Sequence, residues 1–200
     1  MAKHYELELP ENYEEIYHIN AKDSKTGLFL NIWALILTAI AAGITFPIYL
    51  CTKEFSFKID FFTCLYFLGF AVIMVLYLIA HELVHGISYK ILTKQKLSFG
   101  ISWSCAYCGV PKIYVYRKAS MIALIMPFAV FSVLFIGLLV WFYFLNGLLY
   151  LLMALMFSLH FGGCVGDLYM FYLYLFKYKD SSILMRDTGP EQFIYAISKE

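Results

Sequence analysis

Apolar and polar positions divide the chain into four long hydrophobic stretches separated by polar segments. The stretches cover residues 28–50, 61–89, 119–145 and 148–176. Each is long enough to cross the ~30 Å hydrocarbon core of a bilayer as a helix, which requires about 20 apolar residues. The turn-forming pair Asn146-Gly147 separates the last two stretches. These two helices are therefore predicted to form a tight antiparallel pair.

The polar segments define the remaining organisation. Residues 1–27 are predicted to form an N-terminal cytoplasmic segment, residues 28–176 the four-helix membrane domain, and residues 177–200 a cytoplasmic C-terminal tail. Short elements are expected within residues 6–24 and 191–197, with a turn at 187–190. Residues 97–106 and 112–117 are rich in β-branched and aromatic residues and predict the arms of a β-hairpin, with its turn at residues 107–111. The predicted fold is an all-α polytopic membrane protein with four transmembrane helices and a cytoplasmic β-hairpin, at about residues 97–117, between the second and third helices.

Composition agrees with a membrane location. The 200 residues are 62% hydrophobic and 20% aromatic, and only 14% are charged. A soluble domain of this size cannot bury that much apolar surface, so most of it is expected to face the lipid bilayer. The formal net charge of +1 argues against a nucleic-acid partner. The sequence does not indicate an oligomeric state.

The basic residues predict the orientation in the membrane. With four spans, the two terminal segments and the segment between the second and third spans share one side, which holds 13 of the 15 Lys and Arg residues. Only Lys53 and Lys58 lie on the other side. Because basic residues are retained on the cytoplasmic side, both termini are expected there, in what is expected to be a bacterial cell membrane.

Residues 81–85 form an HExxH sequence near the end of the second apolar stretch. Positions i and i+4 of a helix share one face, so His81 and His85 can hold one Zn²⁺ while Glu82 reaches water at the metal. Ionisable residues are costly in a membrane and usually functional there. Away from the helix ends, the apolar stretches contain only five: His81, Glu82, His85, His160 and Asp167.

A catalytic zinc usually has three protein ligands and an open position for water. Measured from Lys90 at ~1.5 Å per residue, His81 and His85 lie about 13 and 8 Å below the membrane edge. Measured from Lys177, Asp167 lies about 15 Å deep and His160 about 25 Å deep. Asp167 is therefore the predicted third ligand, with helix packing or support of a ligand histidine as its alternative roles. His160 is expected to be a satisfied core histidine, a residue lining a polar cavity, or a support for the ligands. The glycines at positions 162, 163 and 166 are expected to allow the close helix approach that Asp167 needs.

The expected chemistry is hydrolysis, in which Glu82 accepts a proton from water activated by zinc and returns it to the leaving amine. The five cysteines do not predict a disulfide framework. Cys105 and Cys108 have the spacing of half a zinc knuckle, but no second pair exists, and the hairpin interpretation is preferred.

These motifs resemble the site-2 protease class of intramembrane metalloproteases. They are also similar to a family of short bacterial membrane proteins regarded as zincin peptidases of unknown function. The resemblance rests on the matching pieces HELVHG (81–86), YCGVP (107–111), Tyr116-Arg117, MPF (126–128) and Gly166-Asp167. It implies cleavage of a membrane protein or peptide substrate within or near the membrane, with an Asp ligand on a later helix and a hairpin that aligns the substrate. The chain has Val165-Gly166-Asp167-Leu168 where site-2 proteases have an Asn-Pro-Asp-Gly type of sequence, a difference that bears on substrate handling.

Two other functions use the same motif. A membrane zinc hydrolase acting on a lipid or a small amide would use the same residues in the same roles. A non-enzymatic membrane scaffold would keep the motif as a structural zinc site and would tolerate Glu82→Gln. A strand-forming hairpin can bind an extended peptide by strand addition and thus favours a peptide substrate. Di-iron membrane oxygenases need several histidine clusters, which a chain with five histidines does not supply.

Overall fold

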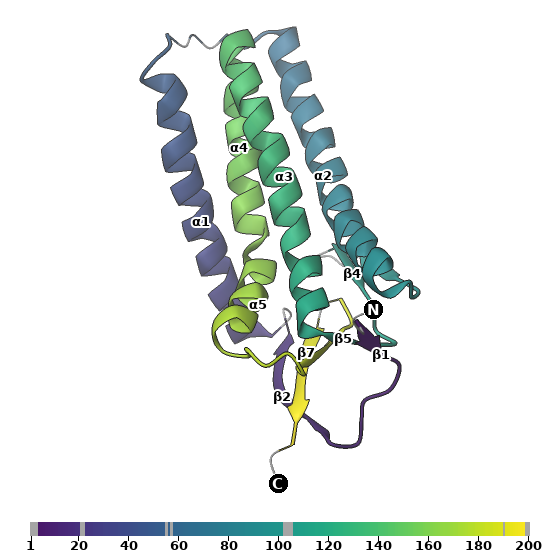
Figure 1. Cartoon of the computed structure of the whole chain (residues 1–200). Helices are drawn as coiled ribbons and strands as arrows, with labels where there is room; N and C mark the ends of the chain where they lie inside the picture. Colours follow the sequence, from purple (N-terminus) through teal and green to yellow (C-terminus); the bar gives the residue numbers. More distant parts are fainter. Residues whose placement is uncertain are drawn as a thin grey trace. The chain divides into compact units, whose positions relative to one another are not determined.

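The computed structural model describes residues 4–20, 23–54, 56, 58–101, 106–189 and 191–198. The chain is mostly helical, and Figure 1 traces its elements in order. Among the described residues, three helices are long and apolar enough to cross a membrane: α1 (Ser24–Leu50), α2 (Phe61–Thr93) and α3 (Arg117–Leu145). The bent pair α4 (Gly147–Gly163) and α5 (Val165–Phe176) gives a fourth span if the two count as one. The expected membrane character is confirmed to this extent.

Side chains at the helix starts explain where the helices begin. The carboxylate of Asp23 accepts a hydrogen bond from the backbone N–H of Thr26 at 3.0 Å, and that of Asp60 accepts one from Thr63 at 2.8 Å. These hydrogen bonds hold the pKa of each carboxyl below its ordinary value. Asn146 caps α4 by accepting from the N–H of Leu149 at 3.1 Å. Each cap satisfies an N–H group that the first turn of a helix leaves without a partner.

The predicted fourth helix is interrupted. α4 ends at Gly163 and α5 begins at Val165, so Cys164 separates two helices where the sequence predicted one. Gly162 is needed for close packing, because a Cβ there would lie 2.1 Å from Oγ1 of Thr38 and 2.6 Å from the carbonyl oxygen of Ala34. A Cβ at Gly163 or Gly166 would meet nothing within 4 Å. Of the three glycines predicted to allow a close helix approach, only Gly162 does so. It packs against α1 rather than α2.

The chain is mostly helical, as predicted, but a five-stranded antiparallel sheet that the sequence did not predict accompanies the helices. Its strands lie in the order β1 (Tyr5–Glu6), β5 (Tyr114–Tyr116), β6 (Leu184–Asp187), β7 (Glu191–Ile197) and β2 (Tyr13–Asn20). The N-terminal and C-terminal polar segments therefore pair with each other. The short element expected at residues 191–197 is β7.

The hairpin between α2 and α3 is shorter than predicted. β3 (Ser98–Ile101) pairs with β4 (Ala106–Gly109), so residues 107–109 belong to an arm rather than to the turn. Residues 102–105, between the two strands, lie outside the described residues. The predicted second arm contains β5, which pairs with β1 and β6 instead. Local β-propensity cannot distinguish these partners, because both are supplied by distant parts of the chain.

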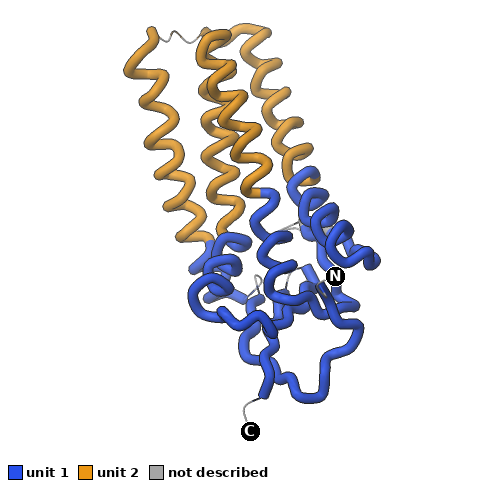
Figure 2. The backbone as a smooth tube through the Cα atoms, viewed as in Figure 1, with its two compact units in different colours: residues 1–30, 80–127, 166–200 blue, residues 31–79, 128–165 orange. Residues whose placement is uncertain are grey.

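The chain divides into two compact units, coloured separately in Figure 2. Unit 1 comprises Met1–Leu30, Ala80–Pro127 and Gly166–Glu200, and unit 2 comprises Asn31–Ile79 and Phe128–Val165. Unit 1 contains the strands of both sheets and a core built from α2, α3, α5 and the sheet, with Tyr89, Val115, Leu124, Met170, Tyr174, Met185 and Ile194 among its buried residues. In unit 2, helices expose large apolar side chains such as Leu35 (72%), Leu68 (63%) and Val133 (74%). Contiguous exposed apolar surface of this kind is typical of contact with lipid.

Candidate metal centre

The two histidines of the HExxH sequence lie on one face of α2, within unit 1. His81 and His85 are one helical turn apart, and their ring centroids are 5.0 Å apart. Both are buried, with 8% and 6% of their surface exposed. The helical spacing thus produces the paired imidazoles that the sequence predicted.

Asp167 lies with these histidines in unit 1. Its Oδ2 atom is 3.2 Å from Nε2 of His81 and 3.2 Å from Nε2 of His85. Asp167 is in the first turn of α5, where the helix dipole favours a negative charge. The break at Cys164 therefore has a consequence for the site, because a continuous helix would place Asp167 in a helix interior.

A contact with the backbone of α3 determines which ring nitrogen of a neutral His85 carries the hydrogen and which carries the lone pair. Nδ1 of His85 lies 2.9 Å from the carbonyl oxygen of Ala123 in α3. A carbonyl oxygen only accepts, so Nδ1 carries the hydrogen and a neutral His85 has its lone pair on Nε2. That lone pair faces a carboxylate oxygen. Two acceptors 3.2 Å apart require a cation between them, either a proton or a metal ion.

The donor set fits zinc. One ligand atom from each of His81, His85 and Asp167 lies within 4.8 Å of the other two. Two imidazole nitrogens and one carboxylate oxygen are ligands that zinc accepts, and three protein ligands leave a fourth position for water. The Nδ1 contact of His85 is the kind of supporting hydrogen bond that orients metal-binding histidines.

Glu82 lies beside the β3–β4 hairpin. The backbone of Cys108, in β4, is near the Glu82 carboxylate. Gly86 allows the hairpin to approach α2 closely, because a Cβ there would lie 2.9 Å from Cζ of Phe99 and 3.1 Å from Sγ of Cys108. The sequence showed HExxHG, but it did not show that the hairpin backbone lies beside the glutamate.

Cys108 has no sign of a zinc-knuckle role. Its side chain is buried, and burial, with the charges of Asp187 and Glu82, raises the pKa of its thiol to about 12. The thiolate that zinc binds is therefore disfavoured at this position. The other half of the motif, Cys105, lies outside the described residues.

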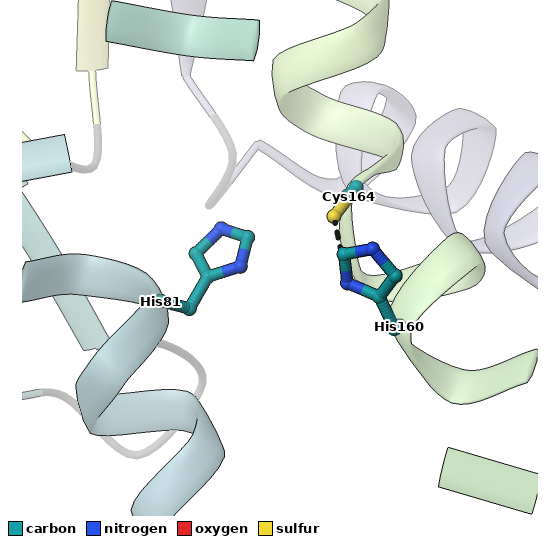
Figure 3. A group of neighbouring side chains, drawn as sticks. All are labelled: His81, His160 and Cys164. Carbon is teal, nitrogen blue, oxygen red and sulfur yellow. Dashed lines mark hydrogen bonds between the residues drawn. The ribbon is translucent and has the colours of Figure 1, made fainter. Parts of the chain in front are cut away.

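His160 belongs to unit 2 and is fully buried. Its Nε2 atom lies 3.1 Å from Oγ of Ser132 and 3.3 Å from the carbonyl oxygen of Phe128, so Nε2 carries the hydrogen. Its Nδ1 atom can then accept from the Tyr77 hydroxyl at 2.7 Å and from the thiol of Cys164 at 3.4 Å. Figure 3 shows the contact with Cys164. Both ring nitrogens of a neutral His160 are thereby satisfied within unit 2.

Sequence reasoning missed Asp187, which was expected only in a turn. Its side chain is buried, with 4% exposed, and accepts hydrogen bonds from the hydroxyl of Tyr89 at 2.9 Å and from the N–H of Gly189 at 2.8 Å. Its carbonyl oxygen accepts from the N–H of Val110, directly after β4. Burial raises the pKa of Asp187 to about 6. This residue joins the end of α2 to the hairpin beside Glu82, and no local sequence signal distinguishes it from an ordinary turn aspartate.

Comparison with known proteins identifies the family. No curated protein and no solved structure matches the chain. A family model matches residues 73–183, a region that includes His81, Glu82, His85 and Asp167. Because this match covers more than half of the 200 residues, the chain belongs to the family described as "putative zincin peptidase".

Proposed function

We propose that this protein is a membrane-embedded zinc metallopeptidase that hydrolyses peptide bonds within or near the membrane. Membership of a zincin peptidase family implies zinc and peptidase activity. The observation that carries the membrane-embedded part is the convergence of the buried His81 and His85 with the partly buried Asp167, the two histidines lying on a helix able to cross a bilayer.

The roles of the residues follow from their chemistry. His81 and His85 offer Nε2 atoms and Asp167 a carboxylate oxygen, and these three side chains would hold the metal. When bound, zinc acts as a Lewis acid that polarises a carbonyl group and makes water at the site more acidic. Glu82 takes a proton from the attacking water and gives it to the amine as the C–N bond breaks, so that one water molecule is consumed for each bond cleaved.

The position of the hairpin supports a peptide substrate. A short two-stranded hairpin beside the HExxHG helix can pair with an extended segment of a substrate. Strand pairing recognises backbone amides, which a lipid substrate lacks.

The proposed location follows from the lengths of the helices and from the distribution of charge. We expect this protein in a bacterial cell membrane with both chain termini in the cytoplasm, because 13 of its 15 basic residues would then lie on the cytoplasmic side. A reporter fused after residue 200 should therefore read as cytoplasmic. An external reading would contradict the four-span arrangement.

The decisive experiment compares the purified wild-type protein with Glu82→Gln in proteoliposomes. We expect about one zinc per chain in both proteins, and cleavage of a library of transmembrane peptides by the wild type alone. A phospholipid and a small amide serve as control substrates, and turnover of either in place of peptides would replace the peptidase proposal with the lipid or amide hydrolase. Equal zinc binding with no hydrolysis by either protein would favour a scaffold with a structural zinc site.

A further inference from the structure

Pro127 interrupts the hydrogen-bond ladder of α3 at a position that faces the metal centre. In an α-helix, the N–H of residue i donates to the carbonyl of residue i−4, and proline has no N–H. Pro127 lies inside α3, so the carbonyl of Ala123 loses its regular helical donor. This is the same carbonyl whose oxygen lies 2.9 Å from Nδ1 of His85.

Because the Ala123 carbonyl is buried, it needs a hydrogen-bond donor in place of the N–H that Pro127 lacks. Ala123 is fully buried, and His85 has only 6% of its surface exposed. A buried carbonyl without any donor is costly, and so is a buried imidazole N–H without an acceptor. The contact between His85 and Ala123 satisfies both groups at once. A helix carbonyl that has lost its N–H donor to proline can accept from a group outside its own helix.

We propose that Pro127 is a positioning residue for the metal centre. By withholding a backbone N–H, it reserves the Ala123 carbonyl for His85 and fixes the tautomer in which the lone pair of Nε2 points at Asp167. The part of this inference that concerns zinc rests on the proposed function. The part that concerns the tautomer of His85 does not, and it can be tested on the metal-free protein.

Two substitutions at position 127 separate the missing N–H from the shape of the proline ring. Pro127→Ala introduces an N–H that competes for the Ala123 carbonyl. Lactate, the α-hydroxy acid counterpart of alanine, introduced at position 127 by nonsense suppression, has the same methyl group but an ester oxygen in place of the N–H. Pro47→Ala is the matched control, because Pro47 is the proline inside another membrane helix, α1, in unit 2.

Two readouts apply to each protein. The first is the ¹⁵N chemical shifts of His85 in the metal-free protein at alkaline pH, where the imidazole is neutral; these shifts report which ring nitrogen carries the hydrogen and are assigned with His85→Ala. The second is zinc affinity, measured by competition with a chelator. Loss of a supporting hydrogen bond typically weakens metal binding about 10–100-fold, and we expect this loss, with a shifted tautomer, in Pro127→Ala. The lactate protein and Pro47→Ala should remain within about threefold of wild type and keep the tautomer.

The outcomes separate this inference from the proposed function. Wild-type tautomer and affinity in Pro127→Ala would overturn the inference, and so would a lactate protein that behaves like Pro127→Ala. If Pro127→Ala does not fold, the lactate protein still decides, since a shifted tautomer there would contradict the role of the missing N–H. If the wild type binds no zinc, the proposed function fails, while the ¹⁵N measurement still tests the role of Pro127.

Discussion

The hydroxyl of Tyr89 donates a 2.9 Å hydrogen bond to the carboxylate of Asp187, 98 residues later in the chain. Tyr89 lies one helical turn after His85 on α2, and Asp187 ends β6. Both side chains are buried, with 1% and 4% exposed. This contact fastens the end of α2 that carries His81 and His85 to the five-stranded sheet.

Removing the Tyr89 hydroxyl is expected to destabilise the fold. Tyr89→Phe leaves a buried carboxylate oxygen of Asp187 without this donor, which should cost about 1–3 kcal/mol. Tyr174→Phe is the matched control, because the buried Tyr174 hydroxyl has no hydrogen-bond partner among the described residues. Its removal should be close to neutral. Unfolding in detergent measures both variants, and a Tyr174→Phe cost equal to that of Tyr89→Phe would contradict the assignment.

Asp187 is expected to make stability depend on pH. Its pKa is raised by burial from 3.8 to about 6, so its stabilising contribution is complete below pH 3.8 and is lost as the pH rises through about 6. The neighbouring charges that act on it are His85 and Asp167. Asp187→Asn has no charge to bury and should gain stability relative to wild type between about pH 4 and 6. A constant difference between the two proteins across pH 4–8 would contradict a raised pKa.

Zinc binding should depend on Asp167 far more than on His160. Asp167→Ala removes the oxygen that lies 3.2 Å from both Nε2 atoms, and we expect zinc affinity to fall more than about 100-fold. His160→Ala removes a residue whose polar partners Tyr77, Ser132 and Cys164 belong to unit 2. It should lower stability while keeping the metal. Chelator competition on detergent-purified protein distinguishes the two, and equal zinc retention would contradict the depth argument.

A side chain at Gly86 should disturb catalysis more than metal binding. Gly86→Ala introduces a Cβ 2.9 Å from Cζ of Phe99 and 3.1 Å from Sγ of Cys108, so these two hairpin side chains must shift by a few tenths of an ångström. Because Cys108 also lies near Glu82, we expect roughly tenfold lower peptide cleavage with zinc affinity unchanged.

Gly69→Ala is the control for this substitution, since Gly69 lies on the same helix and a Cβ there meets nothing within 4 Å. Gly69→Ala should keep full activity. If both variants lost activity equally, helix propensity rather than the hairpin contact would explain the effect.

The sequence by itself determined the features that depend on local composition and spacing. Runs of apolar residues predicted the membrane helices, and the i, i+4 spacing predicted that His81 and His85 share a face. The depth argument placed Asp167 level with these histidines, and its Oδ2 atom lies 3.2 Å from both Nε2 atoms even though the chain breaks at Cys164.

Only the tertiary structure decided the features that join distant segments. β5 could pair with several strands by propensity, and its partners β1 and β6 come from the two ends of the chain. The Cys108 backbone near Glu82 and the Ala123 carbonyl that meets His85 consist of groups that every residue carries and no sequence pattern distinguishes. Their roles depend on burial and on which donor faces which acceptor, and both are set when the segments pack together.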